Sequence, residues 1–216
     1  MIVGLVNQKG GVGKTTLSVC LAYESLLRGN RTLLIDADPQ GSIMDWSDKR
    51  EKELPDKLAI IAMPKKTLHR DLKNVVGGYD MVFIDAPPRT TDITRSTILA
   101  SNLVIIPSTP SPYDVWATEE TIDLVRDGIV YNEKLKYVFT INRKIVNTAV
   151  GRDVRDAVNS LGEDIHLLTS EICQRIAFVE TASQGLAIQE GDKEGKAKKE
   201  IEFLYDEITN YVGVKN

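Results

Sequence analysis

The residues best suited to chemistry form a glycine-rich segment near the start of the chain. It reads Lys9-Gly10-Gly11-Val12-Gly13-Lys14-Thr15-Thr16 and lies between an apolar run and a segment with helical spacing. Glycines at such a place let backbone N–H groups turn inward around phosphate oxygens, and the following helix adds the positive end of its dipole. We expect Lys14 to contact the β- and γ-phosphates of a nucleotide, and the Thr15 hydroxyl to bind Mg²⁺.

The segment departs from the strict phosphate-loop pattern by one residue. In G-x-x-x-x-G-K-[ST] the first glycine would fall at position 8, where this chain has Gln8. The chain carries an additional lysine, Lys9, at the start of the loop. The motif is therefore a deviant version of the Walker A sequence.

Two acidic motifs close later strands of the predicted sheet. Asp36 and Asp38 follow the run Thr32–Ile35, and Asp85 follows Met81–Ile84. Ligands of open α/β sheets bind outside the carboxyl ends of the strands, so these carboxylates should meet the phosphate loop in one crevice. We expect Asp85 to hold Mg²⁺ directly or through water. Asp38 is expected to lie at the metal and to orient the attacking water.

Strand and helix signals alternate along the chain, which positions these motifs. Apolar, β-rich runs predict strands at Ile2–Val6, Thr32–Ile35, Leu58–Ala62, Met81–Ile84, Leu103–Pro107, Tyr137–Ile141 and Ile165–Leu168. Helical spacing predicts helices at Thr15–Leu27, Leu68–Val76, Thr91–Ala100, Val115–Val130 and Lys196–Val212. Two long polar stretches are predicted to be loops, at Asp38–Pro55 and Ser183–Gly195. The strands are continuous apolar runs, which is typical of parallel strands buried on both faces. The sequence predicts one α/β domain over residues 1–216, a doubly wound, mostly parallel β-sheet flanked by helices.

Composition excludes several classes of protein. The 27 Lys and Arg residues and 31 Asp and Glu residues give a net charge of −4, so bulk positive charge cannot drive nucleic-acid binding, although a local basic patch can. The two cysteines, Cys20 and Cys173, lie far apart, which argues against a zinc site, an iron–sulfur site or a disulfide framework. The chain has no run of 18 apolar residues that could span a membrane. These features predict a cytoplasmic protein.

Together the motifs resemble those of the ParA/MinD ATPases. The phosphate loop, Asp36-Ala37-Asp38-Pro39-Gln40 and Val82–Pro88 look like the three motifs of that family, and Pro107–Asp114 and Thr140–Arg143 add to the match. The closest resemblance is to short ParA proteins of plasmid partition, the ParF-like type. It covers nearly the whole chain and weakens after about Gly151.

The resemblance implies a Mg²⁺-dependent ATPase that dimerises around two sandwiched ATP molecules. Lys9 would be the signature lysine that reaches the partner's nucleotide and acts like an arginine finger. Lys9, Lys14 and Asp38 would be the catalytic residues. The residues expected at the nucleotide are Lys9, Gly10, Gly11, Val12, Gly13, Lys14, Thr15, Thr16, Asp36, Asp85, Pro107, Asn142 and Arg143.

The choice between ATP and GTP rests on one strand end. A GTPase of this class reads guanine with Asn-Lys-x-Asp, whereas this chain has Asn142-Arg143-Lys144-Ile145, with Ile145 in place of the aspartate. Adenine is therefore favoured. Asn142 either contacts the base or caps the end of the strand.

The resemblance also implies nonspecific DNA binding through basic residues late in the chain. Arg175, Lys196, Lys198 and Lys199 are the expected contacts, and further candidates are Arg152, Arg155 and Lys193. The alternative is an ordinary solvated charged face. In the last helix, apolar residues at Ile201, Leu204, Ile208 and Val212 look like core packing, so a separate membrane-binding helix of the MinD type is not expected.

The function expected first is partition of plasmid or chromosomal DNA over the nucleoid, with a ParB-like centromere-binding partner that stimulates hydrolysis. The alternative is the same ATPase positioning a protein cargo, such as a carboxysome or a chemotaxis cluster, through another adaptor. A third alternative, expected less than the other two, is a MinD-like membrane regulator of division. The sequence leaves the first two open, because the cargo is chosen by the partner.

Overall fold

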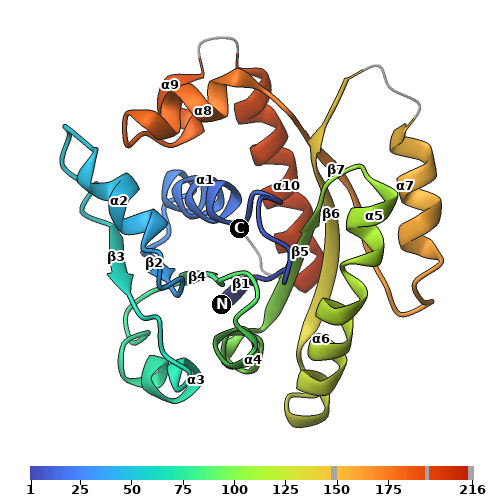
Figure 1. The fold of residues 1–216 in the computed structure, drawn as a ribbon. Helices are drawn as coiled ribbons and strands as arrows, with labels where there is room; N and C mark the ends of the chain where they lie inside the picture. The colour runs from blue at the N-terminus through green and yellow to red at the C-terminus, as the bar shows by residue number, and fades with distance from the viewer. Residues whose placement is uncertain (147–149, 193–194, 214–216) are drawn as a thin grey trace.

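The computed structural model describes residues 1–146, 150–192 and 195–213 (Figure 1). Its centre is a parallel β-sheet with the strand order β3-β2-β4-β1-β5-β6-β7. The strands are β1 (Ile2–Leu5), β2 (Thr32–Asp36), β3 (Leu58–Ala62), β4 (Met81–Asp85), β5 (Leu103–Ser108), β6 (Lys136–Lys144) and β7 (Leu167–Cys173). β2 and β4 are buried along their whole length, as continuous apolar runs predict for central parallel strands.

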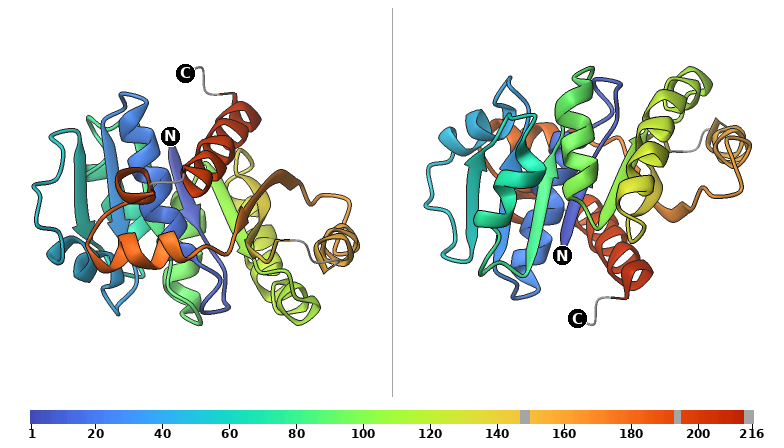
Figure 2. Two further views of the ribbon diagram at one scale, coloured as in Figure 1. Left: turned by 90° about the horizontal axis from the view of Figure 1, so that it is seen from above. Right: turned by 90° about the horizontal axis from the view of Figure 1, so that it is seen from below.

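Helices cover both faces of the sheet (Figures 1 and 2). One face carries α1 (Lys14–Leu27), α2 (Ser42–Asp48), α8 (Ile176–Ser183), α9 (Ile188–Gly191) and α10 (Lys196–Val212). The other carries α3 (Leu68–Asp71), which continues into the 3-10 turn η1 (Leu72–Asn74), then α4 (Thr91–Ala100) and α6 (Glu119–Tyr131). The short α5 (Pro112–Trp116) packs against α7 (Val150–Asn159) near β7. The predicted doubly wound α/β fold is confirmed.

Several local predictions were wrong. The predicted loop Asp38–Pro55 contains α2, and the predicted loop Ser183–Gly195 contains α9. Both helices are too short to show a repeated apolar period. The predicted helix Val115–Val130 is divided between α5 and α6, and α7 and α8 were not predicted at all.

The last strand begins and ends later than Ile165–Leu168, the range predicted for it. β7 lies at the edge of the sheet, and polar residues interrupt its apolar run. The outward backbone N–H groups of Thr169 and Ser170 donate to the carboxylate of Glu207 on α10, at 2.7 and 2.8 Å. An edge strand protected in this way does not need the continuous apolar sequence of a central strand.

The last helix packs into the core, as its sequence predicted. Ile201, Leu204 and Ile208 of α10 are fully buried. Within the described part of the chain, no helix is both long and apolar enough to cross a membrane. Cys20 is buried in α1, Cys173 is half-buried, and both are free thiols.

Candidate functional site

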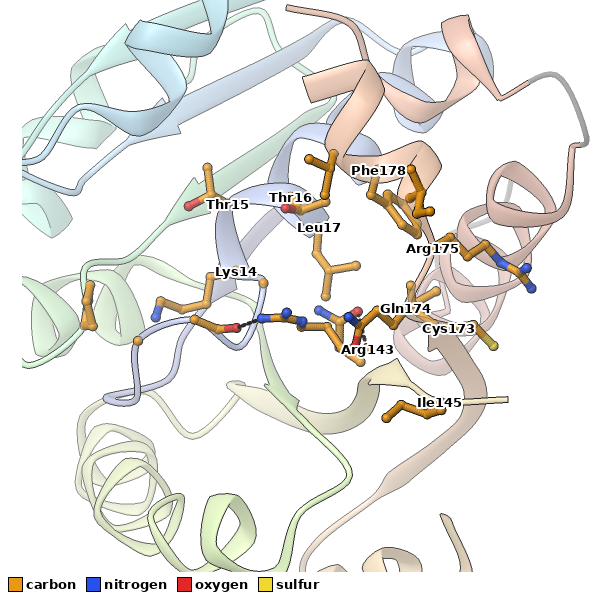
Figure 3. Close-up of a pocket in the computed structure, with 18 of the residues that line it drawn as sticks. Lys14, Thr15, Thr16, Leu17, Arg143, Ile145, Cys173, Gln174, Arg175 and Phe178 are labelled. Atoms are coloured by element: carbon orange, nitrogen blue, oxygen red, sulfur yellow. Dashed lines mark hydrogen bonds between the residues drawn. The ribbon is translucent and has the colours of Figure 1, made fainter. Parts of the chain in front are cut away.

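The phosphate loop lies at the carboxyl ends of β1, β2 and β4, which are neighbours in the sheet (Figure 1). Beside the loop is a cavity of about 910 Å³, shown in Figure 3. The motif residues that line it are Gly10, Gly11, Gly13, Lys14, Thr15, Thr16, Asp38, Asn142 and Arg143. The fold therefore brings three distant parts of the sequence around one space that is large enough for a nucleotide.

Two glycines of the loop have backbone conformations that other residues rarely adopt. Gly11 has a φ of 79° and Gly13 a φ of 89°, both in the left-handed region. A Cβ atom on Gly13 would also come within 2.2 Å of Asn142 Nδ2. Position 13 therefore requires glycine both for its conformation and for the close approach of the neighbouring strand end.

The Lys14 side chain is buried along the loop. Its ammonium donates to the backbone carbonyls of Asn7 at 2.9 Å and Lys9 at 3.0 Å. Burial lowers the pKa of Lys14, while the charges of Asp85 and Asp38 oppose that change. Hydrogen bonds between ionised partners are stronger than bonds to neutral carbonyls. Phosphate oxygens in the cavity could therefore replace these two carbonyls as the acceptors of Lys14.

Thr15 and Asp85 form the part of the site that suits Mg²⁺. The Thr15 hydroxyl donates to one carboxylate oxygen of Asp85 at 2.6 Å, and the Ser18 hydroxyl donates to the other at 3.3 Å. Burial raises the pKa of Asp85 to about 7, and the hydrogen bond from Thr15 opposes that rise. The described residues include no group of three His, Cys, Asp or Glu side chains that could hold a metal. Mg²⁺ usually takes one or two carboxylates, several waters and substrate phosphates, so this oxygen pair fits it.

The two carboxylates of the acidic motif at the end of β2, Asp36 and Asp38, have different surroundings. Asp36 is fully buried and accepts backbone N–H groups of Asp38, Ile43 and Met44 at 3.1, 2.9 and 3.2 Å. It is not among the residues that line the cavity. Asp38 does line the cavity, and its carboxylate accepts the N–H of Gln40 at 2.9 Å. Asp36, which the sequence placed at the nucleotide, therefore holds the loop that presents Asp38.

The end of β6 clasps the phosphate loop. The Asn142 side-chain amide donates to the Val12 carbonyl at 2.7 Å, and its oxygen accepts the N–H of Arg143 at 2.9 Å. Arg143 has a φ of 57°, and its guanidinium donates to the Gly11 carbonyl at 2.8 Å (Figure 3). Both groups of the Asn142 amide are therefore bonded within the chain, and because Asn142 also lines the cavity, its contact with a base stays a prediction. Val12 and Pro107, also expected at the nucleotide, are buried and do not line the cavity.

Lys9 lies at the rim of the loop and forms an ion pair with Asp114 of α5. The Lys9 side chain is 37% exposed, whereas that of Asp114 is only 12% exposed. The hydroxyl of Thr109 is also hydrogen-bonded to the Asp114 carboxylate. In this form of the protein, Lys9 is thus held by its own chain.

The far wall of the cavity was missed by the sequence reasoning. It includes Gln174, Ile176, Phe178 and Val179, which follow β7 and begin α8, together with Arg175, which was predicted from the sequence to contact DNA. Figure 3 shows Gln174, Arg175 and Phe178 on this side of the cavity. Ile145, which stands where a guanine-reading aspartate would be, also lines the cavity. The rule that ligands bind after strand ends would have found this wall, had the last strand been placed at its real position.

Three of the seven predicted DNA contacts form ion pairs within the chain. Arg175 pairs with Glu200, and its side chain points away from the phosphate loop (Figure 3). Lys198 pairs with Glu202 at 3.8 Å. Arg155 pairs with Glu171 at 2.8 Å. The position of Lys193 and the side chain of Arg152 lie outside the part of the chain that the structure describes. Lys196 and Lys199 stand at the start of α10 and are exposed.

Comparison with solved structures shows the same fold. Apo McdA from Cyanothece superposes with a TM-score of 0.77 and 18% identity, over 96% of this chain and 98% of that one. The septum site-determining protein MinD of Pyrococcus horikoshii, solved with Mg-ADP, gives a TM-score of 0.75 and 18% identity, over 100% and 98%.

Sequence comparisons give the family. The "maintenance of carboxysome distribution protein A" of Halothiobacillus neapolitanus is 29% identical over 208 residues, which is 95% of each chain. The "sporulation initiation inhibitor protein Soj" of Bacillus subtilis is 31% identical over 167 residues, which is 58% of this chain and 64% of Soj. The family model of the CobQ/CobB/MinD/ParA nucleotide-binding domain matches residues 3–188. This chain therefore belongs to the CobQ/CobB/MinD/ParA family of nucleotide-binding proteins.

Proposed function

We propose that this chain is a Mg²⁺-dependent ATPase that forms a homodimer when it binds ATP. The observation that carries this proposal is the grouping of Lys14, Thr15 and Asp38 at one cavity beside the phosphate loop, with the buried Asp85 hydrogen-bonded to Thr15 behind that wall. Phosphoryl transfer needs mainly positioning and charge stabilisation, and these side chains supply both.

Each residue has a distinct task in this proposal. Thr15 and Asp85 hold Mg²⁺, which supplies positive charge against the phosphates. Lys14 moves from its carbonyl acceptors to the β- and γ-phosphates, and Asp38 orients the attacking water. Lys9 leaves Asp114 and contacts the nucleotide of the partner subunit, where it stabilises the developing charge.

For the biological role we favour positioning of a protein cargo over partition of DNA. The support is the similarity to the carboxysome distribution protein, which runs over 95% of both chains. In this proposal the ATP-bound dimer lies in the cytoplasm on the nucleoid and binds DNA without sequence preference. A cargo-bound adaptor stimulates hydrolysis and releases the dimer, so the protein does not need a membrane.

Partition of plasmid or chromosomal DNA with a ParB-like partner is the second candidate. It is supported by the similarity to Soj and to the chromosome partitioning protein ParA of Myxococcus xanthus, which is 30% identical over 169 residues. Those matches cover 64% and 60% of the relatives, which is less than for the carboxysome distribution protein.

Replacing the gene by its Lys14→Ala form in the host distinguishes the two roles. Fluorescent labels on large protein assemblies and on low-copy plasmids would follow both cargoes. We expect the assemblies to cluster while the plasmids stay stable. Loss of plasmids with normal assemblies would instead support partition, and normal behaviour of both would contradict either role.

A further inference from the structure

A band of basic side chains runs along α3, apart from the nucleotide cavity. Arg70 lies in α3 and Lys73 in the 3-10 turn η1 that continues it, and Lys66 lies in the turn that leads into α3. All three side chains are exposed, and we call them the α3 basic stripe. Lys65, next to the stripe, is exposed as well.

The charges of the stripe have no acidic partners. In the part of the chain that the structure describes, Lys66, Arg70 and Lys73 make no ion pair and no side-chain hydrogen bond. The one acidic residue of the segment, Asp71, accepts a hydrogen bond from the Thr67 hydroxyl at 3.0 Å. The stripe therefore presents three uncompensated positive charges to solvent.

The positive charge of the stripe affects the pKa of a neighbouring histidine, His69. His69 lies between the stripe and α4, with its ring nitrogen 2.8 Å from the Ser96 hydroxyl. Burial lowers the pKa of His69, the positive charges of Arg70 and Lys73 lower it further, and the negative charge of Asp71 opposes them. At this ring the two cations therefore outweigh Asp71.

Three of the basic residues late in the chain differ from the stripe in this respect. Arg175, Arg155 and Lys198 are each bound to a glutamate of the same chain. A paired cation must give up its carboxylate before it can bind a phosphate, so its net gain is small. An unpaired cation only gives up water and counterions.

We propose that the α3 basic stripe binds the sugar-phosphate backbone of duplex DNA. The choice of DNA as the ligand rests on the proposed function. Because the three cations lie within eight residues on one short segment, they can contact neighbouring phosphates of one strand, which are spaced at a rise of ~3.4 Å. Binding to phosphates alone is independent of base sequence.

The apolar side of α3 favours DNA over a lipid surface. Leu68 and Leu72 are almost completely buried, so the segment offers no apolar side chain to insert between lipids. None of the stripe residues lines the nucleotide cavity, so DNA and ATP do not compete for the same atoms. A dimer carries two stripes, which would link DNA affinity to ATP through avidity.

Fluorescence anisotropy with a labelled random-sequence duplex and a non-hydrolysable ATP analogue tests this site. The variant combines Lys66→Gln, Arg70→Gln and Lys73→Gln. The matched control combines Lys196→Gln, Lys198→Gln and Lys199→Gln, which removes the same charge from the start of α10. We expect the α3 variant to lose DNA affinity by on the order of tenfold to a hundredfold near 0.1 M salt. Its log–log salt slope should flatten by about 2.7 for each stripe in contact.

The control variant should lose much less affinity, and the α3 variant should hydrolyse ATP normally without DNA, which shows that it is folded. A wild-type affinity and slope in the α3 variant would overturn the site and leave the proposed function standing. Failure of the wild-type protein to bind DNA while it hydrolyses ATP would overturn both the site and the DNA-binding part of the function. Binding to anionic vesicles that the α3 variant loses, without any DNA binding, would assign the stripe to lipid instead.

Discussion

Asp114→Asn should strengthen the ATP-dependent dimer. In the structure, Asp114 forms an ion pair with Lys9, the residue that we propose reaches the partner's nucleotide. Dimer formation must break this pair in both protomers. A partly exposed ion pair stabilises a protein by about 1 kcal/mol, so two pairs oppose dimerisation by ~2 kcal/mol. Removing them should lower the dimer Kd roughly thirtyfold. Asparagine keeps an oxygen that can accept the Thr109 hydroxyl, so the loop should stay folded.

Sedimentation velocity with a non-hydrolysable ATP analogue, over a range of protein concentrations, measures this Kd. The double variant Lys9→Ala/Asp114→Asn is the control, because the effect must disappear when Lys9 is absent. An unchanged or weaker dimer in Asp114→Asn would refute the idea that Asp114 restrains Lys9. Equal strengthening in the single and double variants would show that Asp114 acts by another route.

Further predictions concern the phosphate loop and the acidic residues. Lys14→Ala should abolish ATP binding in calorimetry, because the phosphates lose their buried cation, whereas Lys9→Ala should bind ATP but neither dimerise nor hydrolyse it. Asp38→Ala should accumulate as an ATP-bound dimer on a sizing column, while Asp85→Ala should instead lose Mg²⁺-dependent affinity; equal losses of affinity would contradict these separate roles. Because burial raises the pKa of Asp85 to about 7, the folded apoprotein binds more protons here than the unfolded chain between about pH 4 and 7. Its contribution to stability therefore falls as pH rises, and Asp85→Asn should raise the Tm more at pH 8 than at pH 5 without Mg²⁺.

The central strands of the sheet could be predicted well from the sequence, because a parallel strand that is buried on both faces is a continuous apolar run. Met81–Ile84 and Thr32–Ile35 are examples, and both strands extend only one residue beyond the predicted range. The phosphate loop could be predicted equally well, because Gly11 and Gly13 have positive φ angles that other residues rarely adopt. The motifs at β2 and β4 met at one cavity because the sheet order makes those strands neighbours.

The remaining features depend on contacts between distant residues. Asp36 and Asp38 look alike in sequence, and only the bonds from Ile43 and Met44 show that Asp36 holds the loop. From the sequence alone, Arg175 was predicted to be a cation available to DNA. In the structure it is hydrogen-bonded to Glu200, which lies 25 positions later in the sequence. The α3 basic stripe is visible in the sequence, but its importance follows from the lack of acidic partners within the described residues.

The central claim is that hydrolysis takes place in an ATP-bound dimer. It is tested most directly by phosphate release per protomer, measured with Mg²⁺-ATP over a wide range of protein concentration, with Lys14→Ala as the blank. We predict that the specific activity rises with concentration, levels off, and follows the fraction of dimer measured with ATP but not with ADP. A specific activity that is constant from the most dilute sample upward would contradict the account, because each protomer would then hydrolyse ATP without the partner's Lys9.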